Sequence, residues 1–543
     1  MWLRRVVLPI VAVFCLALLV GCGSSTHNPS PPPSGGFSNT DFNGTYTFSI
    51  LGEDLTTGTT FAMAGSMVAC GCTGGTISSG NADYIDIGGQ VVAPNSTISA
   101  GTYAISQDGR GKASLTLTTA GGTVPVILDF VLTSSSHGLI IRFDDNGTGS
   151  GTIDLQPTPV TQSSLANAYA FSVSGADSAS NPLSAEGAFT LNSAGSIASS
   201  PAGIEDVNYA TTVSAGLTLT GGITVGTGTA PGTAVLSATG YPLTFDVYAI
   251  DSTHLKLIES DGQAVLVGDV FTQPTDAIPS GNLVFTVAGL DYTQSPAVPF
   301  AAGGIVSSDG ASQLTGGAED INDGGTVDGG TSPATPLSFN GSFVAMPSGS
   351  GRFVFDLSGF AGGALFAAYP SSGGILLMQI DPGLGKGITG GVAMAQTGTS
   401  IDASQGYGLN LTGADLVNGI ELDAIVEFQT TSSAFTSGLI DVNDGGPANP
   451  ANFGGSYSQA NGVGSATNLT AGLQAMFFYV VDNQTAVFIS TDPSGDQVSL
   501  GAFQEQSAPG GSKAAVAERH LAMVRSVLKA GSARKGHPTQ IGH

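Results

Sequence analysis

The fold is set by Tyr46-Thr47-Phe48-Ser49-Ile50-Leu51-Gly52-Glu53-Asp54, a pattern that returns three times in this chain of 543 residues. The later copies begin at Tyr169, Leu283 and Tyr407, so the steps between copies are 123, 114 and 124 residues. Each copy keeps the Gly and the Asp at the same offsets from its first residue. Self-similarity at a nearly fixed period is typical of a tandem array. The sequence therefore predicts four units of one fold.

Each copy opens with alternating polar and apolar residues, as in the run from Tyr46 to Ile50. Period-two alternation predicts a β-strand with its aromatic residues on one face. The Gly and Asp that follow are expected to mark the exit into a loop. There Gly would supply unusual dihedral angles, and Asp would accept hydrogen bonds from backbone N–H groups.

The same reasoning along a whole unit gives about eight short strands joined mostly by hairpin-length turns. The predicted fold class is all-β, with four tandem antiparallel units. Eight meandering strands can close into an up-and-down barrel, which removes both sheet edges. A two-sheet β-sandwich is the alternative.

Two further markers recur. An Asp follows the opening pattern in every unit, and every unit ends on Gly-x4-Gln. The Asp residues are Asp83, Asp206, Asp320 and Asp441, and the closing residues are Gln156, Gln273, Gln396 and Gln506.

The markers divide the chain into segments. These are residues 1–21 (signal peptide), 22–41 (lipidated Cys and flexible tether), 42–157, 165–274, 279–397 and 401–507 (the four β units), and 508–543 (basic helical tail). Pro-bearing linkers between the units predict that they fold separately.

The N-terminus has the features of a secretory signal. Arg4 and Arg5 precede an apolar run that is short for a membrane span of about 20 residues. The run ends in Leu19-Val20-Gly21-Cys22, which resembles the lipobox of bacterial lipoproteins. The resemblance implies cleavage before Cys22 and lipid on that Cys. Because Gly23 follows, it also implies sorting to the outer membrane. The segment after Cys22 is rich in Ser, Pro and Gly, and is expected to act as a tether.

The unit pattern, from its opening strand to Gly-x4-Gln, resembles tandem repeat lipoproteins of acidobacterial genomes. The likeness covers residues 42–506, with Leu283 and Leu409 as departures at aromatic positions. It implies no catalytic residues.

Charge is unevenly distributed. Residues 23–511 contain 39 acidic and 6 basic residues, whereas residues 512–543 contain one acidic and six basic residues. An acidic body is expected to repel nucleic acid and anionic lipid. The tail predicts a short C-terminal helix over 512–530, which would dock on the last unit or be partly disordered. Contact with anionic lipid or a partner is the alternative.

Four cysteines occur, and Cys15 and Cys22 belong to the signal region. Cys70 and Cys72 are predicted to form a small disulfide across a turn, since exported proteins meet oxidising conditions. Free thiols and half of a metal site are the alternatives.

Two loops are candidates for calcium because Ca²⁺ prefers clustered carboxylate and carbonyl oxygens on a Gly-bent loop. The candidate ligands are Asp320, Asn322, Asp323, Asp441, Asn443 and Asp444. The alternative is an Asx-type turn followed by Gly with positive φ. No other cofactor is predicted.

Nothing in the sequence has the pattern of a catalytic site. No Gly-x-Ser-x-Gly elbow occurs, and His137 and His254 fall in turns expected at the surface. Acidic residues recur at equivalent turns of all units, which indicates a structural role. We therefore predict no enzyme activity. The expected protein is lipid-anchored and exported, periplasmic or surface-exposed, with a binding or structural role and an envelope or extracellular ligand. The alternative is a secreted hydrolase or redox enzyme with its site in one unit only.

Overall fold

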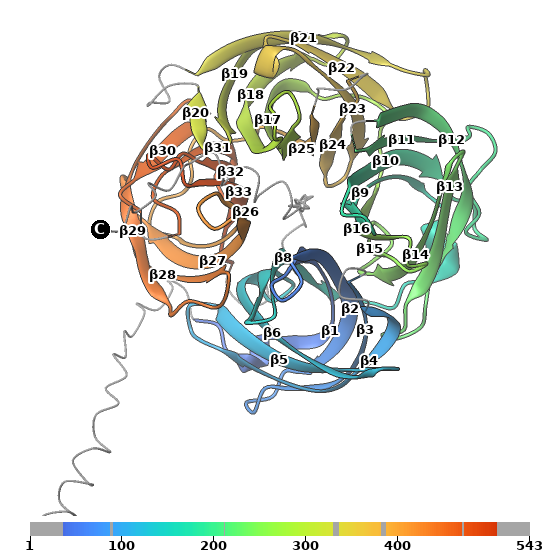
Figure 1. Cartoon of the computed structure of the whole chain (residues 1–543), viewed down its shortest axis with the longest axis vertical. Coiled ribbons are helices and arrows are strands. Elements are labelled where there is room, and N and C mark those ends of the chain that lie inside the picture. The colour runs from blue at the N-terminus through green and yellow to red at the C-terminus, as the bar shows by residue number, and fades with distance from the viewer. Residues whose placement is uncertain are drawn as a thin grey trace, which may run out of the picture. The chain divides into compact units, whose positions relative to one another are not determined.

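Alternating strands fold into four successive β-barrels in the computed structural model of the chain (Figure 1). The structure describes residues 36–86, 91–210, 212–328, 336–381, 387–469 and 472–507. The predicted signal peptide, Cys22 and the helical tail lie outside these residues.

The first barrel is built from β1 (Asn43–Asp54), β2 (Thr59–Cys70), β3 (Thr76–Asp86), β4 (Val91–Ile105), β5 (Arg110–Thr119), β6 (Gly122–Ser134), β7 (His137–Asp144) and β8 (Gly147–Gln156). The second is built from β9 (Ala168–Asp177), β10 (Pro182–Thr190), β11 (Gly203–Tyr209), β12 (Thr212–Thr224), β13 (Gly232–Ala238), β14 (Tyr241–Ala249), β15 (His254–Glu259) and β16 (Ala264–Thr272).

The third barrel is built from β17 (Ser280–Asp291), β18 (Val298–Asp309), β19 (Gln313–Asp323), β20 (Thr326–Asp328), β21 (Leu337–Ala345), β22 (Phe353–Ser358), β23 (Ala364–Ser371), β24 (Gly374–Gln379) and β25 (Ile388–Ala395). The fourth is built from β26 (Gly406–Asp415), β27 (Ile420–Thr430), β28 (Ala434–Asp444), β29 (Ala451–Ala460), β30 (Val463–Thr467), β31 (Met476–Asp482), β32 (Thr485–Ser490) and β33 (Gln497–Glu505). Short 3₁₀ helices are η1 (Asn39–Asp41), η2 (Gln162–Leu165) and η3 (Phe360–Gly362).

Every barrel is an antiparallel meander whose last strand pairs with its first. The closing pairs are β1–β8, β9–β16, β17–β25 and β26–β33. In the third unit β18 also pairs with β19, and the short β20 is added to β19. The all-β prediction and the barrel are confirmed, and the sandwich alternative is wrong.

The opening pattern fills the barrel interior. Tyr46, Phe48 and Ile50 are buried in the core of the first barrel, as the alternation predicts. The Tyr46 hydroxyl donates to the carbonyl oxygen of Ser135 at 2.6 Å. Tyr169 and Tyr407 make equivalent bonds to Ser252 and Asn483. Leu283 has no hydroxyl, so the third barrel lacks this tie.

The repeated Gly lies within the first strand, not at its exit, which corrects the turn interpretation. Gly52 pairs with Gly149, and a Cβ on Gly52 would lie 2.0 Å from the carbonyl oxygen of Thr148. The Gly of the Gly-x4-Gln ending behaves alike, because a Cβ on Gly151 would lie 1.8 Å from the carbonyl oxygen of Ser49. Both glycines thus allow close approach where the barrel closes. The predicted role of the Asp is confirmed, since Asp54 Oδ1 accepts from the backbone N–H groups of Thr56 and Thr57.

The closing Gln of each unit contacts the next barrel in a closed circuit. Gln156 Nε2 donates to the carbonyl oxygen of Ala249, and Gln396 Nε2 donates to that of Val480. Gln273 reaches Pro370 O at 2.9 Å. Gln506, in the last unit, donates to Asp108 O at 2.7 Å and Leu132 O at 3.0 Å in the first.

Apolar clusters accompany these bonds. One cluster joins the first and second barrels, another joins the second, third and fourth, and a third joins the fourth to the first. Each barrel therefore buries apolar outer surface against two neighbours, in addition to its own core.

Candidate functional site: an acidic pocket in the third barrel

The residues predicted to bind calcium lie on two faces of a strand. Asp320 and Asn322 point out of the third barrel. Asp320 accepts from the Tyr479 hydroxyl at 2.7 Å, and Asn322 Nδ2 donates to the carbonyl oxygens of Ser490 and Gln497. Asp323, on the opposite face of β19, lines a pocket in the third barrel. Because side chains alternate along a strand, the three do not converge on one cation.

The fourth unit repeats this split. Asp441 contacts Arg110, with Nη1 3.4 Å from Oδ2, and Asn443 Nδ2 donates to the carbonyl oxygens of Arg142 and Gly147. The remaining predicted ligand is Asp444, on the other face of β28. The geometry therefore does not support one calcium site formed by each triplet.

Both loops are turns capped by the Asn side chain, as the turn alternative predicts, although the amide oxygen accepts from the third residue on rather than from the second. Asn322 Oδ1 accepts from the backbone N–H of Gly325, and Asn443 Oδ1 accepts from that of Gly446. These Gly residues have φ of 85° and 140°, which an L side chain rarely adopts. Each of these turns therefore ends a strand, and the outward side chains before it contact the next barrel.

One end of the third barrel holds a cavity of about 330 Å³. Its lining comes from β17 to β21, η3 and β23 to β25, so it is the mouth of the barrel rather than a junction between barrels. The rim carries Asp291, Asp323 and Asp328, and Phe300, Phe360 and Phe366 form apolar walls below. Phe360 and Phe366 meet edge to face, with ring centroids 5.6 Å apart. The pocket thus combines acidic and aromatic groups.

Asp323 is the carboxylate best placed to bind a ligand. Its Oδ2 accepts from Gln294 Nε2 at 2.6 Å, whereas its Oδ1 is buried without a hydrogen-bond partner among the described residues. Burial, and then the charge of Asp291, raises the pKa of Asp323 to about 6. Asp291 itself accepts from the backbone and hydroxyl of Thr293, so it serves partly as a turn cap.

The pocket wall also contains an amide and a hydroxyl that are already engaged. Gln379 Nε2 donates to Asp381, and Thr389 Oγ1 donates to Gln379 Oε1 at 2.9 Å. Deeper on the same face of β19, Glu319 is fully buried and its Oε1 accepts from the N–H of Ala361. Burial raises the pKa of Glu319 to about 8, so this group is protonated at neutral pH.

Local departures from the repeat accompany the pocket. Leu283 replaces the Tyr that fills the three other barrels, and a small apolar void of about 20 Å³ lies beside it. Between β22 and β23, Gly359 has φ of 92° and Ala361 has φ of 40°. This left-handed turn places Phe360 under the pocket and aims the N–H of Ala361 at Glu319. The sequence signal for the pocket was the group of glycines around Phe360, whereas Leu283 marks only the small apolar void.

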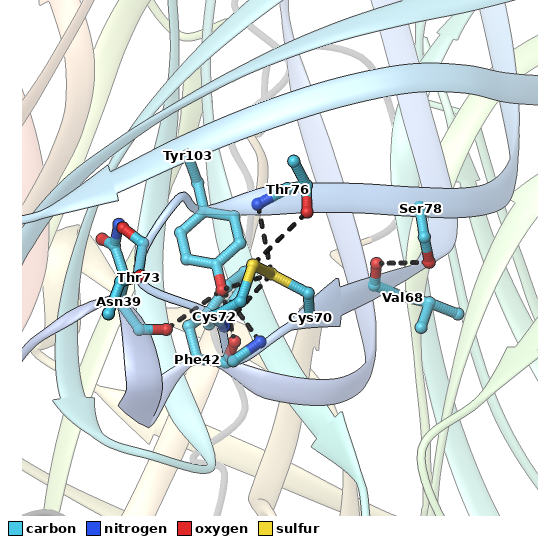
Figure 2. Close-up of a disulfide and its surroundings, with 10 residues drawn as sticks. Asn39, Phe42, Val68, Cys70, Cys72, Thr73, Thr76, Ser78 and Tyr103 are labelled. Atoms are coloured by element: carbon cyan, nitrogen blue, oxygen red, sulfur yellow. Dashed lines mark hydrogen bonds between the residues drawn. A yellow bond between two sulfur atoms is a disulfide. The ribbon is translucent and has the colours of Figure 1, made fainter.

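Cys70 and Cys72 form a disulfide (Figure 2). This is the first of the three predicted alternatives. The bridge lies at the end of β2, where the N–H of Gly71 donates to the Tyr103 hydroxyl at 3.0 Å. Tyr103 in turn donates to the carbonyl oxygen of Phe42 at 2.9 Å. The disulfide therefore belongs to a structural end of the first barrel.

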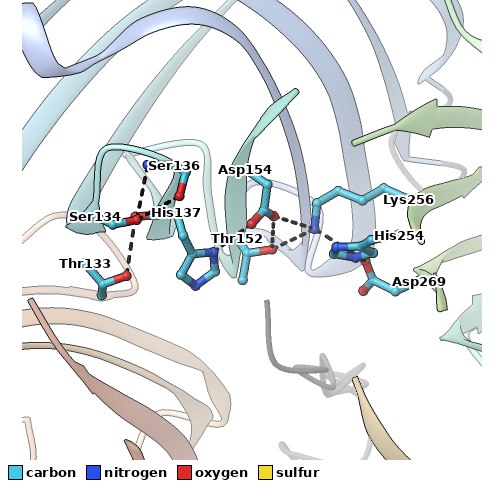
Figure 3. A network of polar contacts seen from close by, with 9 residues as sticks. All are labelled: Thr133, Ser134, Ser136, His137, Thr152, Asp154, His254, Lys256 and Asp269. Atoms are coloured by element: carbon cyan, nitrogen blue, oxygen red, sulfur yellow. Dashed lines mark hydrogen bonds and ion pairs between the residues drawn. The ribbon is translucent and has the colours of Figure 1, made fainter. Parts of the chain in front are cut away.

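The two histidines are buried, which corrects the surface prediction. His137 Nδ1 lies 2.7 Å from Asp154, and His254 Nε2 lies 2.7 Å from Asp269 (Figure 3). Lys256 bridges the pairs, with Nζ 3.5 Å from Asp154 and 3.4 Å from Asp269. Burial opposes ionisation of Asp154, but His137 and Lys256 outweigh it and lower its pKa. This network ties the first barrel to the second.

Among the described residues, no three His, Cys, Asp or Glu side chains are grouped as a metal site. Within the same residues, no helix has the length and hydropathy needed to cross a membrane.

Comparisons with known proteins add little. No family model matches the sequence, and a search of curated proteins finds no match. Fourteen solved chains show a faint likeness, among them the following three. They are intact Ap-TbpB with its N and C lobes (8% identity, 68% of this chain and 84% of that chain, TM-score 0.19), transferrin binding protein B of Haemophilus parasuis Hp5 (9%, 69% and 83%, 0.20) and isotype 1 transferrin binding protein B of serogroup B Neisseria meningitidis (9%, 68% and 84%, 0.18). Such low TM-scores carry no argument about fold or function.

Proposed function

We propose that the protein is an exported, lipid-anchored binding protein of the cell envelope, and that its ligand site is the pocket of the third barrel. The proposal of export and lipid anchoring rests on the sequence Leu19-Val20-Gly21-Cys22 and on the tether that follows it. The outer membrane, with exposure to the periplasm or the surface, is the proposed location. The acidic body argues against nucleic acid as a partner.

The observation that carries the binding role is the cavity itself. Its volume of about 330 Å³ lies in the range of small-molecule sites. It opens at the mouth of one barrel, where the strands form a rigid frame. A purely structural role does not require a cavity of this size.

An enzyme with its site in one unit is the rival class. The described lining offers carboxylates, an amide, two threonine hydroxyls and aromatic rings. These groups can hold and orient a ligand. Among the described lining residues, the one hydroxyl beside a carboxylate is that of Thr293, which donates to Asp291. The same carboxylate also accepts from the Thr293 backbone N–H, which is the pattern of a turn cap rather than of an activated nucleophile. The lining therefore favours binding.

The proposed function is tested by titrating the full chain in a calorimeter with two small compounds that each join an apolar phenylbutyl part to a polar end, 4-phenylbutan-1-ol and 4-phenylbutylamine. We expect at least one of them to bind to the wild type. Ala364 lies on the pocket wall, and Ala364→Phe should fill the cavity and weaken binding at least tenfold. Its melting curve shows whether the variant is folded. If neither compound binds, or if folded Ala364→Phe binds as well as wild type, the pocket is not the site.

Lipidation is tested separately. Mass spectrometry of the protein purified from its own membranes should show an N-terminal Cys22 that carries a diacylglyceryl group. Cys22→Ser should release the protein from the membrane fraction. An unmodified N-terminus at another residue would disprove the anchor and leave the pocket proposal standing.

A further inference from the structure

The geometry points to an organic cation as the ligand of the third-barrel pocket: an ammonium group joined to an apolar part. This inference rests on the proposed function and specifies its ligand class. Asp323 would hold the ammonium, and the phenylalanine walls would hold the apolar part.

The sign of the charge follows from the rim. Asp291, Asp323 and Asp328 line the pocket, and none of its described lining residues is basic. An anionic ligand would meet three carboxylates in a partly desolvated site, where like charges repel more strongly than in water. A cation would be attracted by the same groups.

Hydrogen-bonding capacity selects a donor. Asp323 Oδ1 is buried and has no partner among the described residues, while Oδ2 is engaged by Gln294. A buried carboxylate oxygen without a partner costs free energy, and an ammonium N–H would supply the missing bond. A ligand without a donor would leave the oxygen unsatisfied.

The walls select an organic cation over a metal ion. Asp323 has apolar neighbours in Ile321, Phe300 and Phe360, and the described residues contain no three-ligand metal group. Metal ions require several oxygen or nitrogen ligands. An ammonium needs one carboxylate and gains from aromatic faces. The rest of the ligand would remove apolar wall surface from water.

The acidic and amide residues next to Asp323 on β19 are not available to bind the ammonium group. Asp320 and Asn322 face the fourth barrel and are bonded there. Glu319 is deeper in the barrel and protonated, so it adds no charge to the site. Asp323 is therefore the group to test.

The test uses three compounds with the same phenyl group and carbon chain: 4-phenylbutylamine, 4-phenylbutan-1-ol and 4-phenylbutyrate. We expect the amine to bind the full chain at least tenfold more tightly than the alcohol, and the carboxylate to show no binding. Asp323→Asn should reduce the affinity for the amine to that for the alcohol, and leave the affinity for the alcohol unchanged.

Asp444→Asn is the matched control. Asp444 ends β28 as Asp323 ends β19, and its pKa is likewise raised by burial and a neighbouring Asp, to about 7. It does not line the pocket. We expect Asp444→Asn to bind all three compounds as wild type does, which excludes general attraction of amines to an acidic protein.

The outcomes separate the two proposals. Binding of the alcohol and the amine with equal affinity would overturn the cation inference and leave the pocket in place. Preference for the amine that survives Asp323→Asn, or that Asp444→Asn abolishes, would also overturn it. If no compound binds, the proposed function fails.

Discussion

Asp206→Ala is expected to destabilise the protein by about 3–5 kcal/mol, because it leaves a guanidinium buried without its counter-ion. Asp206 Oδ1 accepts from Arg352 Nη2 at 2.8 Å, and both residues are buried at the junction of the second and third barrels. The same carboxylate accepts from the Tyr369 hydroxyl and from the N–H of Gly216. One substitution therefore leaves three donors without their acceptor.

Urea unfolding followed by circular dichroism measures this effect. The matched control is Asp320→Ala, at the equivalent position one unit later, where the carboxylate accepts from the Tyr479 hydroxyl. Its cost should be about 1–3 kcal/mol, since no buried cation is left behind. Adding Arg352→Met to Asp206→Ala should recover much of the lost stability. Equal costs at the two positions, or no recovery, would contradict the buried ion pair.

Stability should fall as the pH rises from 5 to 8.5, by at least about 3 kcal/mol. Burial raises the pKa of Glu205, Glu319 and Glu427 to about 8, and that of Asp423 to about 7. In the unfolded chain these groups titrate near pH 4. Between about pH 4 and 8 the folded state therefore binds more protons than the unfolded state. Its stability is full below that window and is lost as the pH rises through it.

Melting curves across this pH range give the test. Glu205 is a suitable probe because it is buried in the second barrel and neither carboxylate oxygen has a partner among the described residues. Glu205→Gln removes one titration, so its melting temperature should depend less on pH and should exceed that of wild type at pH 8.5. The carboxylates with lowered pKa, such as Asp54 and Asp177, act only at lower pH. A higher melting temperature at pH 8.5 than at pH 5 would contradict the predicted loss of stability with rising pH.

The barrels could be predicted from the sequence because their determinants are local. Alternation at Tyr46, Phe48 and Ile50 defines an inward face wherever the strand pairs. The cap at Asp54 and the turn at Asn322 involve residues only a few positions away. Such patterns repeat in each unit, and the repetition makes them visible.

The junctions could not be predicted in the same way. Gln396 bonds a carbonyl 84 residues away, and Gln506 bonds one 398 residues away. The sequence shows that these positions recur, but not that their partners lie in the next barrel. Because the partners in the next barrel could not be read from the sequence, Asp320 and Asn322 were predicted to bind calcium in a loop. His137 was predicted to lie in a surface turn for the same reason.

These junctions also modify the prediction of separately folding units. Each barrel closes on itself, which supports separate folding. Its outer face nevertheless buries apolar residues and polar groups such as Asp206 against a neighbour. Cutting a unit out at the Pro-bearing linkers would expose these apolar and polar groups to water. We therefore expect an isolated unit to be less stable than the same unit in the full chain.

The pocket was hidden for a different reason. A cavity forms where many side chains together leave space unfilled, so no single residue in the sequence indicates it. Leu283 was visible as a departure from Tyr, but it lines the small apolar void and not the acidic pocket, whose walls come from Phe300, Phe360 and Phe366. Asp323 was predicted as a candidate ligand for calcium, together with residues that the strand places on its other face.

The most direct test of the acidic pocket as a cation site is a crystal structure of the full chain with 4-phenylbutylamine. The predicted result places the ammonium within hydrogen-bond distance of Asp323 Oδ1 and the phenyl ring among Phe300, Phe360 and Phe366. An empty pocket at a saturating concentration of the amine, or a ligand bound with its nitrogen away from Asp323, would contradict the proposal.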